Sequence, residues 1–190
     1  MLRGMGREYY ELSPEIVDWL AVQHLFFVAT APLAKDGHVN LSPKGYDTFR
    51  VLDPRRVAYL DLTGSGIETV AHVRENGRIT LLFCAFEGPP RLVRLYGRAK
   101  VVEPGDDAWP SLLARFGEHR GARAVIDVAL SSARDSCGYS VPLLAYQGER
   151  ERLADWAANR DDEELAAYRR TRNAFSLDGL VGLRDQSEVD

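Results

Sequence analysis

Short runs of apolar and β-branched residues follow one another along the first third of the chain, with only a few residues between them. The runs are 26–30, 39–42, 48–52 and 57–62. The connections contain Asp36-Gly37, Pro43 and Asp53-Pro54, which are residue types that end strands and form turns. Connections this short join antiparallel neighbours, so the pattern predicts an antiparallel meander rather than a series of βαβ units. No Gly-x-Gly-x-x-Gly follows the first run, which argues against a Rossmann fold.

Helices and further strands are expected around this meander. Ser13-Pro14 predicts the start of the first helix, because Ser is a good N-cap and Pro suits the first helical position. Glycine-containing kinks beside the strands suit a small closed barrel. The order predicts a mainly β protein with flanking helices (α+β) that forms a single domain, 1–190. This domain should consist of an N-terminal helix at 12–24, a barrel core with inserted helices at 25–146, and a C-terminal helix and tail at 147–190. The other expected helices are 67–75, 107–116 and 149–171, and the other expected strands are 78–86, 91–102, 123–130 and 139–146.

The composition excludes several classes of protein. The 190 residues are 45% hydrophobic and 27% charged, which is ordinary for a soluble globular protein. The net charge is −4 and no basic face stands out, so we expect no nucleic-acid partner. No apolar run approaches the roughly 20 residues of a membrane span, and the charged segment 1–11 does not resemble a signal peptide. We therefore expect a cytoplasmic protein. Cys84 and Cys137 belong to no CxxC pair or Cys/His cluster, so no metal site is expected, and Cys84 should be buried.

The first segment that could carry chemistry is Asn40-Leu41-Ser42-Pro43-Lys44-Gly45. A hydroxyl and an ammonium stand two residues apart at a strand end, beside a glycine that lets a ligand approach closely. Ser42 can hydrogen-bond a phosphate or the edge of a flavin ring, and Lys44 can attract an anion. A solvated turn explains the same residues without a ligand.

The second segment runs from Tyr59 to Thr69. Its loop, Thr63-Gly64-Ser65-Gly66, opens a predicted helix whose backbone amides can bind phosphate. Glu68 lies in the first turn, where it suits the helix dipole but would repel a phosphate. A well-capped helix explains Ser65, Glu68 and Thr69 without any ligand, so both interpretations stay open.

The third segment is 91–98, where strand alternation places Leu92, Arg94 and Tyr96 on one face. Arg94 and Tyr96 can line a site for an anion, or they can simply face water. The four histidines do not cluster in the sequence and no Gly-x-Ser-x-Gly elbow is present, so a hydrolase triad is not expected. No catalytic residue is assigned.

The order of these segments is familiar. A strand ending in Ser42-Pro43-Lys44-Gly45 precedes a strand ending near Tyr59 and Asp61. A Gly/Ser loop then opens a helix that ends in Glu75-Asn76-Gly77-Arg78, and the runs 79–83 and 94–99 follow. This set, over about residues 20–103, resembles the pyridoxamine 5′-phosphate oxidase-like, FMN-binding split-barrel superfamily. The segment 137–142 and the C-terminal helix are similar to an uncharacterised branch of it.

The resemblance implies an antiparallel split β-barrel and a homodimer with two FMN sites at the subunit interface. The residues that would lie along the flavin ring are Ser42, Lys44, Gly45, Tyr59 and Asp61. The residues that would lie towards the ribityl phosphate are Ser65, Gly66 and Thr69, together with Lys44. Arg94 and Tyr96 would lie within reach of the cofactor or of the partner subunit.

The resemblance also implies an FMN-dependent oxidoreductase acting on an unidentified small molecule. True oxidases carry an Arg-Lys pair where this chain has Glu68 and Thr69, so fewer cations should face the phosphate. They also end in an Arg-x-His segment that this chain lacks, having Asp178-Gly179-Leu180 near its end, so pyridoxamine 5′-phosphate is not the expected substrate. The alternatives are a flavin-storage module without turnover, a split barrel holding a deazaflavin or haem, and a barrel without cofactor that serves as an interaction protein.

Overall fold

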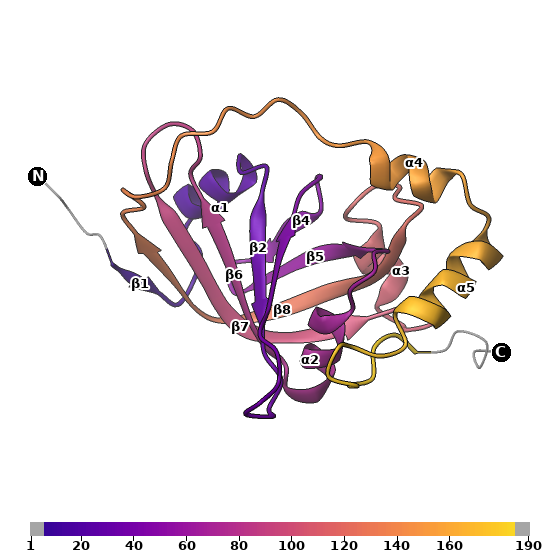
Figure 1. Cartoon of the computed structure of the whole chain (residues 1–190). Coiled ribbons are helices and arrows are strands. Elements are labelled where there is room, and N and C mark those ends of the chain that lie inside the picture. The colour runs from indigo at the N-terminus through magenta and orange to yellow at the C-terminus, as the bar shows by residue number, and fades with distance from the viewer. Residues whose placement is uncertain (1–5, 185–190) are drawn as a thin grey trace, which may run out of the picture.

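Residues 6–184, which the computed structural model describes, fold around one antiparallel sheet of eight strands (Figure 1). The strands are β1 (Glu8–Tyr9), β2 (Phe26–Thr30), β3 (Asn40–Lys44), β4 (Phe49–Asp53), β5 (Arg56–Leu62), β6 (Arg78–Cys84), β7 (Leu92–Val102) and β8 (Ala122–Ser136). The helices are α1 (Pro14–Ala21), α2 (Glu68–Asn76), α3 (Trp109–Leu113), α4 (Arg152–Ala158) and α5 (Asp162–Arg172). The predicted α+β class and the antiparallel meander are confirmed.

The sheet has the strand order β3-β2-β6-β7-β8-β5-β4, and β1 pairs with β8. β3 and β4 are its two edges; residues 45–48 join them in sequence, but no ladder between them is found within residues 6–184. The expectation of a closed barrel is therefore wrong, and the barrel is split between β3 and β4. The predicted strand 39–42 was to end at Pro43, whereas β3 continues through Pro43 to Lys44. An edge strand tolerates proline because one row of its N–H groups has no ladder partner.

The core lies inside the split barrel, where alternate side chains of the strands meet α1 and α2. Val28, Leu81 and Leu95 are paired across β2, β6 and β7 and are fully buried. α1 begins as predicted, since the Ser13 side chain accepts a hydrogen bond from the Ile16 N–H. Ile16 packs into the same cluster. Burying an aliphatic side chain of this size contributes about 1.5–3 kcal/mol, so this cluster holds α1 and the sheet together.

The longest pairing joins β7 to β8 and is interrupted by a bulge between Tyr96 and Gly97. A Cβ at Gly97 would lie 2.5 Å from the carbonyl oxygen of Ala129, so glycine is needed where the two strands approach. The predicted strand 123–130 is too short, because β8 continues to Ser136. The extension contains polar residues, which hide the strand pattern in the sequence, but its backbone continues to pair with β7.

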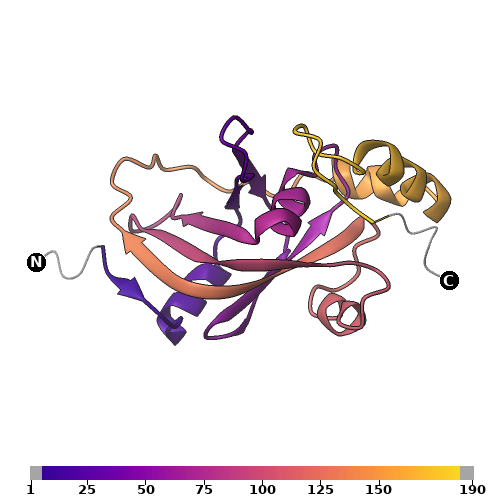
Figure 2. The same cartoon turned by 90° about the horizontal axis from the view of Figure 1, so that it is seen from below.

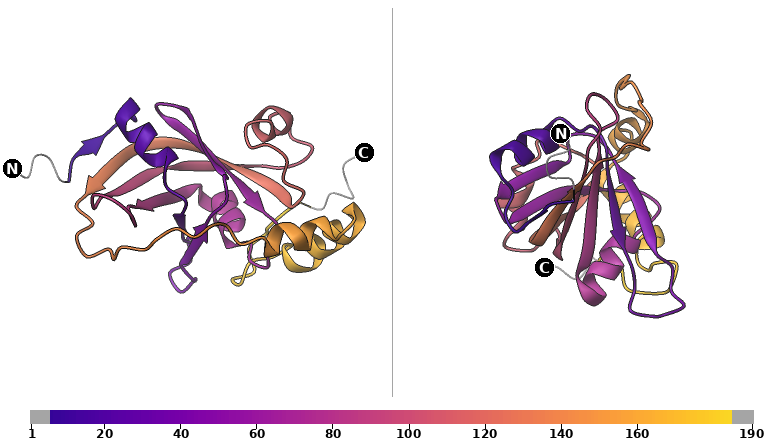
Figure 3. Two further views of the ribbon diagram at one scale, coloured as in Figure 1. Left: turned by 90° about the horizontal axis from the view of Figure 1, so that it is seen from above. Right: turned by 90° about the vertical axis from the view of Figure 1, so that its left-hand side faces the viewer.

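The C-terminal part differs most from the sequence prediction. Segment 139–146 is not a strand; it belongs to irregular backbone that runs from β8 across the molecule to α4 (Figures 1 and 3). The single predicted helix 149–171 is two helices, because Asp161 and Glu164 form a capping box that starts α5. α4 and α5 lie together at the end of the molecule opposite β1 (Figure 2). α3 is also shorter than the predicted 107–116.

Among residues 6–184, no helix combines the length and the apolar character that a bilayer crossing requires. The ends of the predicted 1–190 domain, 1–5 and 185–190, lie outside the described residues, as does the first part of segment 1–11. Cys84 is buried as predicted, and burial raises the pKa of its thiol.

Candidate functional site

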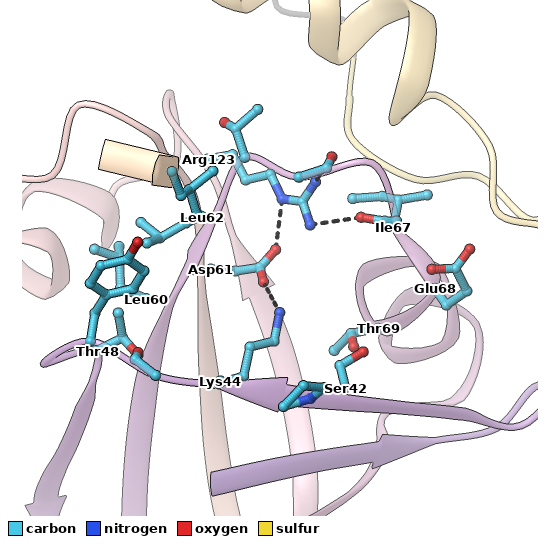
Figure 4. A pocket seen from close by; sticks show the side chains of 17 residues that line it. Ser42, Lys44, Thr48, Leu60, Asp61, Leu62, Ile67, Glu68, Thr69 and Arg123 are labelled. Atoms are coloured by element: carbon cyan, nitrogen blue, oxygen red, sulfur yellow. Dashed lines mark hydrogen bonds and ion pairs between the residues drawn. The ribbon is translucent and has the colours of Figure 1, made fainter. Parts of the chain in front are cut away.

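A cavity of about 270 Å³ opens at the split in the barrel, between β3, β5 and the start of α2 (Figure 4). The turn between β3 and β4, the loop between β5 and α2, Arg123 of β8 and Leu153 of α4 complete its walls. Two of the three segments singled out in the sequence meet here. The lining residues are Ser42, Pro43, Lys44, Gly45, Tyr46, Thr48, Leu60, Asp61, Leu62, Thr63, Gly64, Gly66, Ile67, Glu68, Thr69, Arg123 and Leu153.

A buried carboxylate, Asp61 of β5, lies between two cations in this cavity (Figure 4). Its oxygens accept hydrogen bonds from Lys44 Nζ at 2.8 Å and from Arg123 Nε at 2.7 Å. Burial alone would raise the pKa of Asp61, but the charges and hydrogen bonds of Arg123 and Lys44 outweigh it and lower that pKa to about 2. Asp61 is therefore ionised and acts as a fixed counter-ion rather than as an exchangeable acid or base.

Arg123 also organises the loop between β5 and α2. Its Nη1 donates to the Gly64 carbonyl at 3.1 Å, and its Nη2 donates to the Gly66 carbonyl at 2.8 Å. Because each peptide unit is planar and trans, the N–H groups that follow these carbonyls point away from the guanidinium. Asn173, which ends α5, accepts from Arg123 Nη1 at 2.9 Å and donates to the Gly64 carbonyl at 2.9 Å. The C-terminal region therefore helps to hold the loop.

The first turn of α2 has no side-chain cap within the described part of the chain. Its N-cap residue is Ile67, and Ser65 is exposed and does not line the cavity. The alternative interpretation of this segment, a well-capped helix, is therefore wrong. An uncapped helix start directs several backbone N–H groups outward, which is the arrangement that binds anions.

A chain of hydrogen bonds joins the cavity to His72, which is buried on α2. The Asn40 amide nitrogen donates to Thr30 Oγ1 at 3.1 Å and to Thr69 Oγ1 at 2.9 Å, and its carbonyl oxygen accepts from Ser42 Oγ at 2.8 Å. Thr30 Oγ1 lies 3.0 Å from His72 Nδ1. Burial lowers the pKa of His72 despite the nearby carboxylates, so the ring is neutral. The Thr30 hydroxyl has two lone pairs, so it can donate to Nδ1 or accept from it, and the tautomer of the neutral ring sets the direction of this hydrogen bond.

This chain sets the hydrogen-bond character of two hydroxyls in the cavity. Ser42 donates its proton to Asn40, so it offers an acceptor to the cavity. Thr69 accepts from Asn40 and keeps its own proton for donation. The cavity therefore presents an acceptor on β3 and a donor at the start of α2.

Tyr46, in the turn between β3 and β4, has a φ of 57°. This left-handed conformation costs a residue with a side chain roughly 1–2 kcal/mol. The Tyr46 N–H donates to Glu149 Oε2 at 3.2 Å, and its hydroxyl donates to the Arg150 carbonyl. Tyr146 donates to Glu149 Oε1 at 3.0 Å and stacks on His24. The irregular segment before α4 is thus tied to the rim of the cavity.

The structure brings together six of the ten predicted site residues: Ser42, Lys44, Gly45, Asp61, Gly66 and Thr69 all line the cavity. Tyr59 is fully buried against Phe26 instead, and its hydroxyl has no hydrogen-bond partner within residues 6–184. Burial and the charge of Asp61 raise the pKa of Tyr59. Ser65 faces solvent. Arg94 and Tyr96 lie on the opposite face of the sheet, where Arg94 donates to Ser136 Oγ at 3.0 Å.

Sequence reasoning missed two guanidinium groups beside the loop, those of Arg123 and Arg169. Arg169 of α5 donates from Nε to Thr63 Oγ1 and from Nη2 to the Ala122 carbonyl, both at 3.0 Å. Burial and the charge of Arg123 lower the pKa of Arg169, but a guanidinium remains charged. One signal was available, since Arg123 is a charged residue at the start of an apolar strand. In the part of the chain that is described, no group of three His, Cys, Asp or Glu side chains can hold a metal ion.

The fold and the cavity define a class, a split-barrel protein with a cavity at the split. The family model described as pyridoxamine 5′-phosphate oxidase matches residues 12–138. A relative from Aspergillus flavus, pyridoxamine 5′-phosphate oxidase family protein ustO, is 40% identical over 203 residues, which cover 95% of this chain and 80% of the relative. The chain therefore belongs to the pyridoxamine 5′-phosphate oxidase family, as the resemblance predicts.

Solved structures share the fold. A Lactobacillus delbrueckii protein provisionally named a pyridoxamine 5′-phosphate oxidase superposes with a TM-score of 0.54 at 23% identity, covering 68% of this chain and 98% of that chain. A single-residue variant of HupZ from Group A Streptococcus superposes with a TM-score of 0.50 at 25% identity, covering 65% and 98%. The family match ends at residue 138, so α4 and α5, which support the cavity, lie outside it.

Proposed function

We propose that the protein binds FMN in this cavity and acts as a flavin-dependent oxidoreductase on a small molecule. The observation that carries the proposal is the group of anion-binding features at one end of the cavity. There, an uncapped helix start, a glycine-containing loop and an excess of positive charge meet. Family membership supports the flavin, because the resemblance that the family match confirms implies FMN.

The glycines of the loop support a ligand that approaches the backbone closely. Neither Gly64 nor Gly66 has a positive φ. An added Cβ at Gly64 would have only ordinary contacts, and at Gly66 it would meet only the flexible end of the Glu68 side chain. The protein's own backbone and packing therefore do not explain why glycine stands at both positions. A phosphate cradled by the loop amides explains it.

The charge around the loop supports an anionic ligand. Lys44, Arg123 and Arg169 bring three positive charges, of which Asp61 neutralises one. Even with Glu68 counted, positive charge remains in excess, and buried charge without a counter-ion is costly. One positive charge is left when Asp61 and Glu68 are both counted, and a phosphate monoester, with about −1.5 to −2 charges at pH 7, would more than neutralise it. In this chain the cations come from β3, β8 and α5 rather than from the start of α2.

The two hydroxyls with fixed hydrogen-bond character suit the two ends of FMN. Thr69 would donate to the phosphate, and Ser42 would accept from an N–H group at the ring edge. When bound, the flavin supplies the redox chemistry, while these side chains bind and orient it. The free acceptor at Ser42 gives the ring end of the cavity its selectivity.

We also propose that the protein is a homodimer whose cofactor sites lie at the interface. Two cross-strand rows on β2, β6 and β7 point away from the core and are only half-buried. Their mixture of apolar, aromatic and guanidinium groups is typical of an interface. Light scattering should give the mass of two chains, and Leu82→Arg should give that of one. These rows are Phe27–Leu82–Arg94 and Ala29–Thr80–Tyr96.

The absorbance spectrum of the freshly purified protein tests the flavin. We expect flavin bands, or their appearance when FMN is added, and anaerobic reduction of the bound flavin by a nicotinamide donor. Gly66→Val should weaken FMN binding at least about tenfold, because a branched side chain fills the loop where the phosphate would sit. A colourless protein that ignores added FMN refutes the proposal. A deazaflavin or haem spectrum would show that the protein binds that cofactor instead of FMN. Bound FMN that no donor reduces would indicate a storage module.

A further inference from the structure

We propose that the cofactor site extends beyond FMN, and that the adenine end of FAD binds in a recess formed by α4 and α5. The inference rests on the proposed function, because the recess continues the cavity proposed to hold FMN. It has a volume of about 330 Å³ and shares Thr63, Gly64 and Leu153 with that cavity. Its other walls are Arg152, Trp156 and Tyr168.

The place of the shared wall decides which part of a ligand reaches the recess. Thr63 and Gly64 belong to the loop that leads into α2, where the phosphate of FMN is proposed to lie. None of the residues from Ser42 to Tyr46, where the flavin ring is proposed to lie, lines the recess. A group in the recess would therefore be attached beyond the FMN phosphate. In FAD that group is a second phosphate followed by adenosine.

The chemistry of the recess fits an adenylate. The rings of Trp156 and Tyr168 lie with their centroids 4.8 Å apart at 69°, so they form two aromatic walls that meet at an angle. The guanidinium of Arg160 lies over the indole ring, 4.2 Å from its centre, and is held there because its Nη1 donates to the Trp156 carbonyl at 2.8 Å. Arg152 is exposed and lines the recess. It offers a cation for a second phosphate.

Packing of the two helices does not by itself explain the aromatic pair. Ala157 of α4 and Leu165 of α5 are each 2% exposed and already bury the inner faces of these helices. Trp156 and Tyr168 remain half-buried and line the recess. A partly exposed aromatic surface beside a phosphate site is suited to stacking with a nucleobase.

Calorimetric titration of the full chain, stripped of any cofactor, with FMN and FAD tests the inference. The wild type should bind FAD about tenfold more tightly than FMN, the scale of one base stacking on an aromatic side chain. Trp156→Leu should remove this preference and leave the affinity for FMN unchanged. Trp19→Leu is the matched control, because Trp19 also stacks with an arginine but lies on α1, and it should preserve the preference. Arg152→Ala, at an exposed position, should reduce the preference and provides the test if Trp156→Leu does not fold.

The outcomes separate this inference from the proposed function. Equal affinity of the wild type for FMN and FAD overturns the adenine site alone. Equal weakening of both flavins by Trp156→Leu overturns it too, because it assigns Trp156 a structural role. Another outcome is a wild type that shows no preference for FAD but binds AMP while FMN is bound. That result would assign the recess to a separate nucleotide and would also overturn the adenine site. Binding of neither flavin overturns both proposals.

Discussion

Removal of the Arg123 guanidinium should be the most damaging single change at the cavity. Arg123→Met keeps much of the side-chain volume, but the Asp61 carboxylate, which is 1% exposed, then keeps only the Lys44 ion pair among those found within residues 6–184. The pKa of Asp61 is about 2 against an ordinary 3.8, which corresponds to about 2.4 kcal/mol in favour of the ionised carboxylate. The variant also loses the anchors at Gly64 and Gly66. Breaking a buried pair typically costs about 3–5 kcal/mol, and we expect that loss here.

Urea unfolding at several pH values checks this prediction. The wild-type contribution of Asp61 is present above about pH 3.8 and is lost as the pH falls towards 2, because its pKa is lower in the folded state. In Arg123→Met the pKa of the buried Asp61 rises, so the carboxylate becomes protonated at a higher pH and the cost of its buried charge is removed. The deficit relative to wild type should therefore shrink between pH 7 and pH 4. In thermal unfolding at pH 7, the melting temperature should fall by roughly 6–20 °C.

Arg56→Met is the matched control for this experiment. Arg56 of β5 makes two hydrogen bonds, at 2.8 and 2.7 Å, to Asp127 of the paired strand β8. Its side chain is 46% exposed, so the pair should contribute only about 0–1 kcal/mol. A cost below about 1 kcal/mol for Arg123→Met, or a cost that stays constant from pH 7 to pH 4, would contradict the buried ion pair.

Three further predictions concern the ligand site and its support. Glu68→Gln should tighten FMN binding about three- to tenfold in a fluorescence titration, because it removes a negative charge beside the phosphate; weaker binding would place the phosphate elsewhere. Asn40→Leu should weaken FMN binding about tenfold and riboflavin binding less, because Thr69 loses its orientation towards the phosphate; equal losses would contradict that role. His72→Asn should flatten the fall in stability below pH 6.5, since wild-type His72 has a lowered pKa and the unfolded chain takes up a proton that the folded chain does not. Unfolding curves measured at pH 5 and pH 7 check this, and an unchanged pH dependence would refute it.

The strands of the barrel could be predicted from the sequence because local signals specify them. The prediction 26–30 coincides with β2, and 57–62 differs from β5 by one residue. The failure at 139–146 has a different cause. Its apolar residues, among them Leu143 and Leu144, remain exposed, and the edges of the sheet are used by β3 and β4 instead. A run of apolar residues does not reveal whether a partner strand is available.

The break between α4 and α5 has a signal in the sequence, the capping box that starts α5. Asp161 and Glu164 stand three residues apart within a continuous run of charged residues, which hides a helix start among residues typical of a solvated helix face. The break has a consequence for the site. A single straight helix would not form the recess, which uses Trp156 from α4 and Tyr168 from α5.

The site itself shows why its electrostatics could not be inferred from the local pattern. Ser42, Lys44 and Thr69 were found because they stand at a strand end and a helix start, but the missing Arg-Lys pair then counted against a phosphate. Arg123 reaches Asp61 from 62 residues away, because β8 pairs with β5, and Arg169 reaches Thr63 from 106 residues away, because α5 packs on the loop. The positive charge of the site thus depends on a helix outside the family match. A chain cut at the end of that match would retain the barrel strands but lose Arg169 and the hydrogen bond that Asn173 accepts from Arg123, so the proposed anion site requires the C-terminal helices.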